Sequence, residues 1–123
     1  MIFSTKKFIR SIINALRGVR YASKEQNFRI QAIISVIVVF FAIFFNLKTW
    51  ERVALILIIV FILVLEILNS IFERVVDILE PRVHPYAKVI KDMMAAAVLI
   101  SSVGAILIGF IVFGPYVGVF LRM

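Results

Sequence analysis

The chain has 123 residues, of which 63% are hydrophobic, and its mean hydropathy is +1.11. A water-soluble domain of this length lacks the polar surface to cover so much apolar material, so an ordinary soluble globule is excluded. The net charge is +7, but the cations flank apolar runs, which argues against a nucleic-acid-binding protein. The sequence contains no cysteine, which excludes disulfide scaffolds and thiol nucleophiles.

The first 29 residues are predicted to form an amphipathic surface region. Apolar side chains recur at helical spacing from Phe8 to Leu16, and basic side chains occupy the opposite face. Such a helix lies in the plane of the membrane interface. The alternative is a solvated basic arm, which requires the apolar stripe to be accidental.

Three apolar runs follow, and each approaches the roughly 20 residues that a helix needs to cross about 30 Å of hydrocarbon. We expect transmembrane helices at about residues 30–47, 53–72 and 93–113. Lys and Arg gather before the first run and in residues 74–92, so positive-inside bias places the N-terminus in the cytoplasm. The expected fold is an all-α membrane protein, a single domain over residues 1–123 with an N-terminal surface helix and three spans.

The last two spans carry further local signals. Pro81 and Pro85, on either side of His84, predict an ordered turn between them. Small residues at four-residue intervals in the third span allow two helix backbones to approach closely, within one chain or between copies. These residues are Ala97, Ser101, Ala105 and Gly109.

A polar stripe runs along the second span and its continuation. It consists of Glu66, Asn69, Glu73, Asp77 and Glu80. At about 100° per residue, this spacing falls on a narrow arc of a helix. The apolar run before Glu66 places its carboxylate inside the hydrocarbon, near the cytoplasmic surface. Because a carboxylate is costly there, Glu66 is the leading functional candidate. The structural alternative is a protonated glutamate that is hydrogen-bonded to a neighbouring helix, for example through Asn69 or Ser70.

The stripe suits a reaction between a lipid hydroxyl, which cannot leave the interface, and a charged cosubstrate, which cannot enter it. Glu66 can act as a general base toward the hydroxyl. Glu73 and Glu25 can hold Mg²⁺, which takes one or two carboxylates together with phosphate oxygens. Lys91 can stabilise the charge that develops during phosphoryl transfer, and Asp92 can orient Lys91 or cap the third helix.

Two alternatives stay open at this point. Glu25 can form an ordinary surface pair with Arg29, one helical turn away. The whole chain can be a non-enzymatic transporter or pore subunit that uses Glu66 as a proton or ion site. The confinement of the ionisable residues to one side of the membrane favours the enzyme.

These residues resemble a known family. The stretch from Glu66 to Asp77, followed by His84, by Lys91-Asp92 and by an alanine-rich segment, is similar to the bacterial integral-membrane diacylglycerol kinase and undecaprenol kinase family. The segment that begins at Glu25 is similar to the stretch before that family's first span. The resemblance covers residues 6–113, and Asn-Phe-Arg-Ile at residues 27–30 favours the undecaprenol kinase branch.

The resemblance implies a lipid kinase that transfers the γ-phosphoryl group of ATP to undecaprenol or diacylglycerol, with Mg²⁺ as cofactor. It implies a homotrimer in the bacterial inner (cytoplasmic) membrane, with active sites on the cytoplasmic side that are shared between subunits. By position, Glu66 is the catalytic base and contacts the lipid together with Ala95, while Glu25 and Glu73 bind the metal. The implied ATP-binding residues are Lys6, Glu25, Asn69, Glu73, Asp77, Arg82, Val83, His84, Lys91 and Asp92.

Overall fold

The computed structural model describes residues 2–80, 82 and 84–123, and this part of the chain forms four helices and no strand. The helices are α1 (Thr5–Ala22), α2 (Gln26–Phe44), α3 (Thr49–Leu79) and α4 (His84–Arg122). Three segments are long and apolar enough to cross a membrane: Gln26–Phe44, Thr49–Leu79 and Pro85–Arg122. The expected all-α fold with three candidate spans is therefore confirmed.

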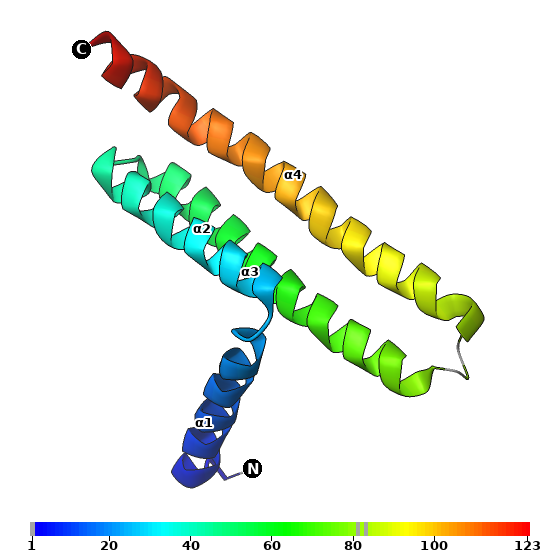
Figure 1. Cartoon of the computed structure of the whole chain (residues 1–123). Helices are drawn as coiled ribbons and strands as arrows, with labels where there is room; N and C mark the ends of the chain where they lie inside the picture. The colour runs from blue at the N-terminus through cyan, green and yellow to red at the C-terminus, as the bar shows by residue number, and fades with distance from the viewer. Residues whose placement is uncertain (1, 81, 83) are drawn as a thin grey trace.

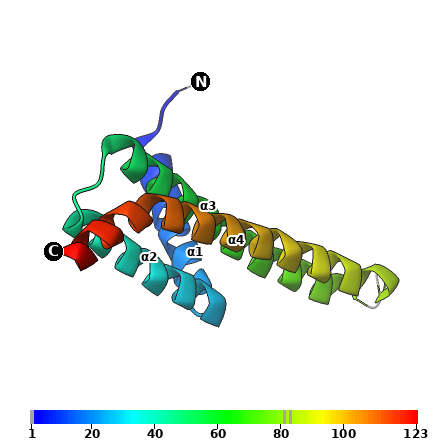
Figure 2. The same ribbon diagram turned by 90° about the horizontal axis from the view of Figure 1, so that it is seen from above.

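The three long helices run along one direction, whereas α1 leaves them at a steep angle (Figures 1 and 2). α3 is the central helix, because it packs against both α2 and α4, most extensively against α4. α3 and α4 form a hairpin, and we call the end that holds residues 73–92 the hairpin end. The opposite end holds the turn between α2 and α3.

α1 is the amphipathic helix that the sequence predicts. The Ser4 hydroxyl accepts a hydrogen bond of 3.4 Å from the backbone N–H of Lys7 and so caps the first turn. The side chains from Phe8 to Leu16 are exposed in the described part of the chain. An uncovered apolar face is what a helix on a membrane surface requires, and its location there stays a prediction.

The helix boundaries differ from those of the expected spans, and α3 and α4 extend beyond theirs at both ends. Two of the differences have a clear local cause. α2 ends at Phe44 rather than at Leu47, because Asn46 adopts a left-handed φ of 52° that ends the helix and that asparagine tolerates. α4 begins at His84 rather than near residue 93, so Pro85 lies in its first turn. Proline is accommodated there because the first N–H groups of a helix have no intrahelical acceptor. Pro85 therefore does not bound a turn as expected, and Pro81 lies outside the described residues.

α3 and α4 are longer than the bilayer requires. They contain 31 and 39 residues, and at 1.5 Å per residue this corresponds to about 46 and 58 Å, against about 30 Å of hydrocarbon. Both helices are therefore long enough to extend past the apolar layer, and the polar hairpin end is the part suited to project beyond it.

The most enclosed apolar core lies at the opposite end. Leu47, Leu55 and Val112 are 2%, 5% and 1% exposed and bring together the α2–α3 turn, α3 and α4. Beside them the buried Glu51 accepts a hydrogen bond of 2.8 Å from the backbone N–H of Lys48 and another from the Tyr116 hydroxyl. This end of α3 is thereby attached to α4, while the polar stripe lies toward the hairpin end.

The packing predicts that Leu55→Ala destabilises the protein by about 2 kcal/mol or more, because the enclosed site leaves a cavity. The measurement is reversible unfolding of the purified protein in mixed detergent micelles. Leu57→Ala is the matched control, because Leu57 is 65% exposed on the same helix. Equal losses of stability for the two variants would contradict the assignment of this core.

Candidate active site

Glu66 is buried at the start of the polar stripe, the end nearest the apolar part of α3. Its side chain is 3% exposed, and it shares a face of α3 with Leu55 and Ile62, which the neighbouring helices also cover. The 3.6-residue period of the helix places all three on one side. The bundle therefore shields the carboxyl group, which does not face the surrounding lipid.

The described residues provide no hydrogen bond to the side chain of Glu66. Asn69, the partner in the structural alternative, donates instead to Glu73 Oε1 at 3.4 Å, and Ser70 forms no bond with Glu66 either. In the described part of the chain, every fully enclosed side-chain oxygen has a hydrogen-bond partner. The Glu66 carboxyl has none among these residues, so it is not fully enclosed and keeps a small opening. A shielded carboxyl without a protein partner is available to a substrate hydroxyl.

Glu25 reaches α3 from the start of α2. It occupies the N-cap position of α2, but its side chain makes no capping hydrogen bond. Instead, its Oε1 accepts a hydrogen bond of 3.1 Å from Arg74 Nη2, 49 residues along the chain. The alternative of a surface pair with Arg29 is therefore not observed, because the packing of α2 on α3 brings Arg74 to Glu25 instead.

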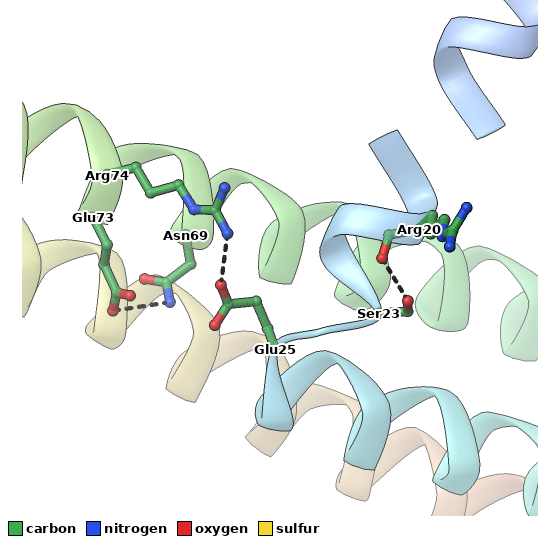
Figure 3. A network of polar contacts seen from close by, with 6 residues as sticks. All are labelled: Arg20, Ser23, Glu25, Asn69, Glu73 and Arg74. Atoms are coloured by element: carbon green, nitrogen blue, oxygen red, sulfur yellow. Dashed lines mark hydrogen bonds and ion pairs between the residues drawn. The ribbon is translucent and has the colours of Figure 1, made fainter. Parts of the chain in front are cut away.

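Figure 3 shows how the two carboxylates proposed for the metal are arranged. In this view the Asn69 amide lies between the carboxylates of Glu25 and Glu73, and the Arg74 guanidinium reaches down to Glu25. The side chains come from the start of α2 and from successive turns of α3. The fold thus joins Glu25 to α3 through Arg74, the residue that directly follows Glu73.

These ligands fit Mg²⁺, a hard cation that binds one or two carboxylates and completes its shell with water and phosphate oxygens. The described residues contain no group of three His, Cys, Asp or Glu side chains that could hold a metal alone. The oxygen donors of Glu25 and Glu73 are therefore suitable but too few. A metal at this site requires further oxygens from a bound nucleotide or from water.

The hairpin end carries two further ion pairs. Lys91 Nζ donates to Asp77 Oδ1 at 2.6 Å and links α4 to α3. Lys88 Nζ donates to Asp92 Oδ2 at 3.3 Å within α4. Asp92 therefore neither orients Lys91, which Asp77 holds, nor caps α4, which begins two turns earlier, at His84. Its implied role in binding ATP stays a prediction.

The remaining predicted site residues are more scattered. Lys6 is exposed in the first turn of α1, at the end away from the α3–α4 hairpin (Figures 1 and 2). Arg82 is exposed, and its backbone N–H donates to the Leu79 carbonyl at 2.9 Å. Ala95 is exposed on α4, and Val83 lies outside the described residues. One chain therefore does not bring Lys6 to the stripe.

Arg74 is the residue that the sequence pattern does not single out. It directly follows Glu73, so it lies about 100° around the helix from the polar stripe. With Glu25 it lines a groove between the second half of α1 and α3. From the sequence alone, Arg74 is only one of several cations that set the orientation of the chain in the membrane. Its partner Glu25 is brought near it only by helix packing.

Comparison with known proteins identifies the family. The family model described as prokaryotic diacylglycerol kinase matches residues 13–113. The undecaprenol kinase of Bacillus subtilis is 33% identical over 110 residues, which cover 89% of this chain and 89% of that protein. The diacylglycerol kinase of Escherichia coli is 31% identical over 102 residues, 82% of this chain and 84% of that protein. The diacylglycerol kinase of Synechocystis is 35% identical over 97 residues, 77% of this chain and 55% of that protein.

The family match spans the start of α2, the polar stripe and the hairpin end, where the resemblance was noted. It covers most of the chain, and the relatives from Bacillus subtilis and Escherichia coli are matched over most of their own length. The chain belongs to the prokaryotic diacylglycerol kinase family.

Proposed function

We propose that this protein, a member of a lipid kinase family, transfers the γ-phosphoryl group of ATP to the hydroxyl of undecaprenol or diacylglycerol. The observation that carries the proposal is the shielded Glu66 carboxyl, which has no hydrogen-bond partner among the described residues and lies on the same stripe as Asn69 and Glu73. The sequence at residues 27–30 favours undecaprenol as the acceptor.

The reaction follows from the position of Glu66. As the base, its carboxylate takes the proton of the lipid hydroxyl while the hydroxyl oxygen bonds to the γ-phosphorus and ADP departs. The low polarity around a buried carboxylate keeps water from competing with the lipid as acceptor. A Glu66 side chain hydrogen-bonded to its own helix bundle would be less free to accept this proton.

Other residues of the stripe and hairpin end would hold the nucleotide. Mg²⁺ held by Glu25 and Glu73 would offset the negative charge of the phosphates. The Asp77 carboxylate fixes Lys91 against α3. The Lys91 ammonium group would thereby lie close to the phosphates of a bound nucleotide. Asn69 orients Glu73 through its amide. In this proposal, each of these residues acts by position and charge.

We propose that the active unit is a homotrimer in the bacterial inner membrane, with its sites on the cytoplasmic side, where ATP is available. The incomplete metal shell and the distance of Lys6 from the stripe support a site completed by a neighbouring copy. A Cβ built at Gly104 or Gly109 would meet nothing within 4 Å in this chain. The small residues of α4 therefore leave room for another helix to approach.

The distribution of buried charges gives little support to the alternative function, a transporter or pore subunit. Glu51 and Glu66 are the two buried charged residues of the described chain, and they lie near opposite ends of the apolar part of α3. Between them, residues 53–65 are entirely apolar. A proton or ion path needs polar groups at intermediate depths, and this helix offers none.

Glu66→Gln is expected to lower phosphate transfer by about 10²- to 10⁴-fold, because glutamine keeps the shape of the side chain but cannot take up the proton. The measurement uses purified protein in detergent, labelled ATP, Mg²⁺ and each lipid separately. Glu51→Gln, which alters the other buried carboxylate of α3, serves as control and should retain transfer. Comparable transfer by wild type and Glu66→Gln would remove Glu66 as the base, and failure of the wild type with both lipids would reject the kinase.

Glu25→Gln and Glu73→Gln are each expected to raise the Mg²⁺ concentration for half-maximal activity. The change should reach at least about tenfold, because the loss of an outer-sphere partner alone already lowers metal affinity by about 10- to 100-fold. Titration of each variant with Mg²⁺ at fixed ATP measures this value. An unchanged Mg²⁺ dependence in both variants would contradict the metal assignment.

A further inference from the structure

The contact between Glu25 and Arg74 is unusual because it engages a proposed metal ligand. Arg74 Nη2 lies 3.1 Å from Glu25 Oε1, and the side chains are 61% and 40% exposed. Glu73, the other proposed ligand, accepts only the longer bond of 3.4 Å from the Asn69 amide. A full positive charge from the protein is therefore bound to one of the two carboxylates that would hold the metal.

A guanidinium and a divalent cation compete for the same carboxylate. Arg74 contacts Glu25 directly, so a metal must either share the carboxylate with the guanidinium or displace it. Sharing places two positive groups a few ångströms apart, which is unfavourable. Displacement is inexpensive, because an ion pair with this exposure contributes at most about 1 kcal/mol.

We propose that Arg74 is an internal counterion for Glu25: it occupies this carboxylate while no metal is bound and is displaced when a divalent cation binds. The inference rests on the proposed function in one respect, the assignment of Glu25 as a metal ligand. Arg74 is thus a positioning residue. It holds Glu25 toward α3 in the empty site and sets the metal concentration at which the site fills.

A purely structural tether predicts the opposite result. If Arg74 served only to attach the start of α2 to α3, its loss would loosen Glu25 and weaken or leave unchanged the binding of metal. If Arg74 is a competing cation, its loss frees the carboxylate and strengthens the binding of metal. The sign of the change in metal affinity therefore separates the two roles.

The test is direct Mn²⁺ binding, followed by electron paramagnetic resonance, to the full chain in detergent without nucleotide or lipid. Arg74→Gln should bind Mn²⁺ about two- to fivefold more tightly than wild type, the factor that corresponds to an exposed ion pair. Arg74→Lys, which keeps the charge, should remain closer to wild type. Arg52→Gln is the matched control, because Arg52 lies at the far end of α3 and contacts Asn46, and it should not change binding.

A double-mutant cycle sharpens the result. In the Glu25→Gln background, Arg74→Gln should lose most of its effect, because the carboxylate for which the two cations compete is gone. Equal or weaker Mn²⁺ binding by Arg74→Gln, the same gain with and without Glu25, or no bound Mn²⁺ in any variant would overturn the proposal. The readout needs no catalysis. Tighter binding by Arg74→Gln in a protein that phosphorylates neither lipid would therefore reject the proposed function while keeping this inference.

Discussion

The burial of a carboxyl group within a membrane-spanning helix is the constraint on which the rest of the structure depends. Glu66 is 3% exposed on a helix that otherwise presents apolar side chains along residues 53–65. A carboxyl group costs free energy in hydrocarbon, so it must be shielded from lipid, and its presence there needs a functional reason. The neighbouring helices provide the shielding, and in the proposed function a hydroxyl-bearing lipid would provide the reason, because a membrane-bound acceptor could meet a base there.

The two ends of α3 serve different purposes. At one end Leu47, Leu55 and Val112 form a closely packed core, and Glu51 and Tyr116 join α3 to α4. At the hairpin end the polar groups lie in exposed ion pairs, such as that between Asp77 and Lys91. Packing at the first end holds the helices in register, while charges at the other end remain free to exchange partners with a ligand. The proposed displacement of Arg74 from Glu25 would be one instance of such an exchange.

Residue patterns along the sequence predict those features that lie within a single helix. The period of the apolar residues predicts α1, the apolar runs predict the spans, and the spacing from Glu66 to Asp77 predicts the stripe. Patterns fail where neighbouring elements decide the outcome. Glu25 pairs with Arg74 rather than Arg29 because α2 packs on α3, and α4 starts at His84 because a proline is tolerated in a first turn. Lys6, which only the family resemblance supplies, lies in the first turn of α1 and is not brought to the stripe by one chain.

Contact between the lipid acceptor and Glu66 can be tested by chemical protection, since the chain has no cysteine of its own. The Glu66→Cys variant in lipid bilayers would be exposed to a membrane-permeant thiol reagent with and without saturating undecaprenol or diacylglycerol. Leu57→Cys, at a position on α3 that is 65% exposed, provides the comparison. We expect the acceptor to slow labelling at position 66 and not at position 57. Identical labelling rates at position 66 with and without either lipid would contradict it.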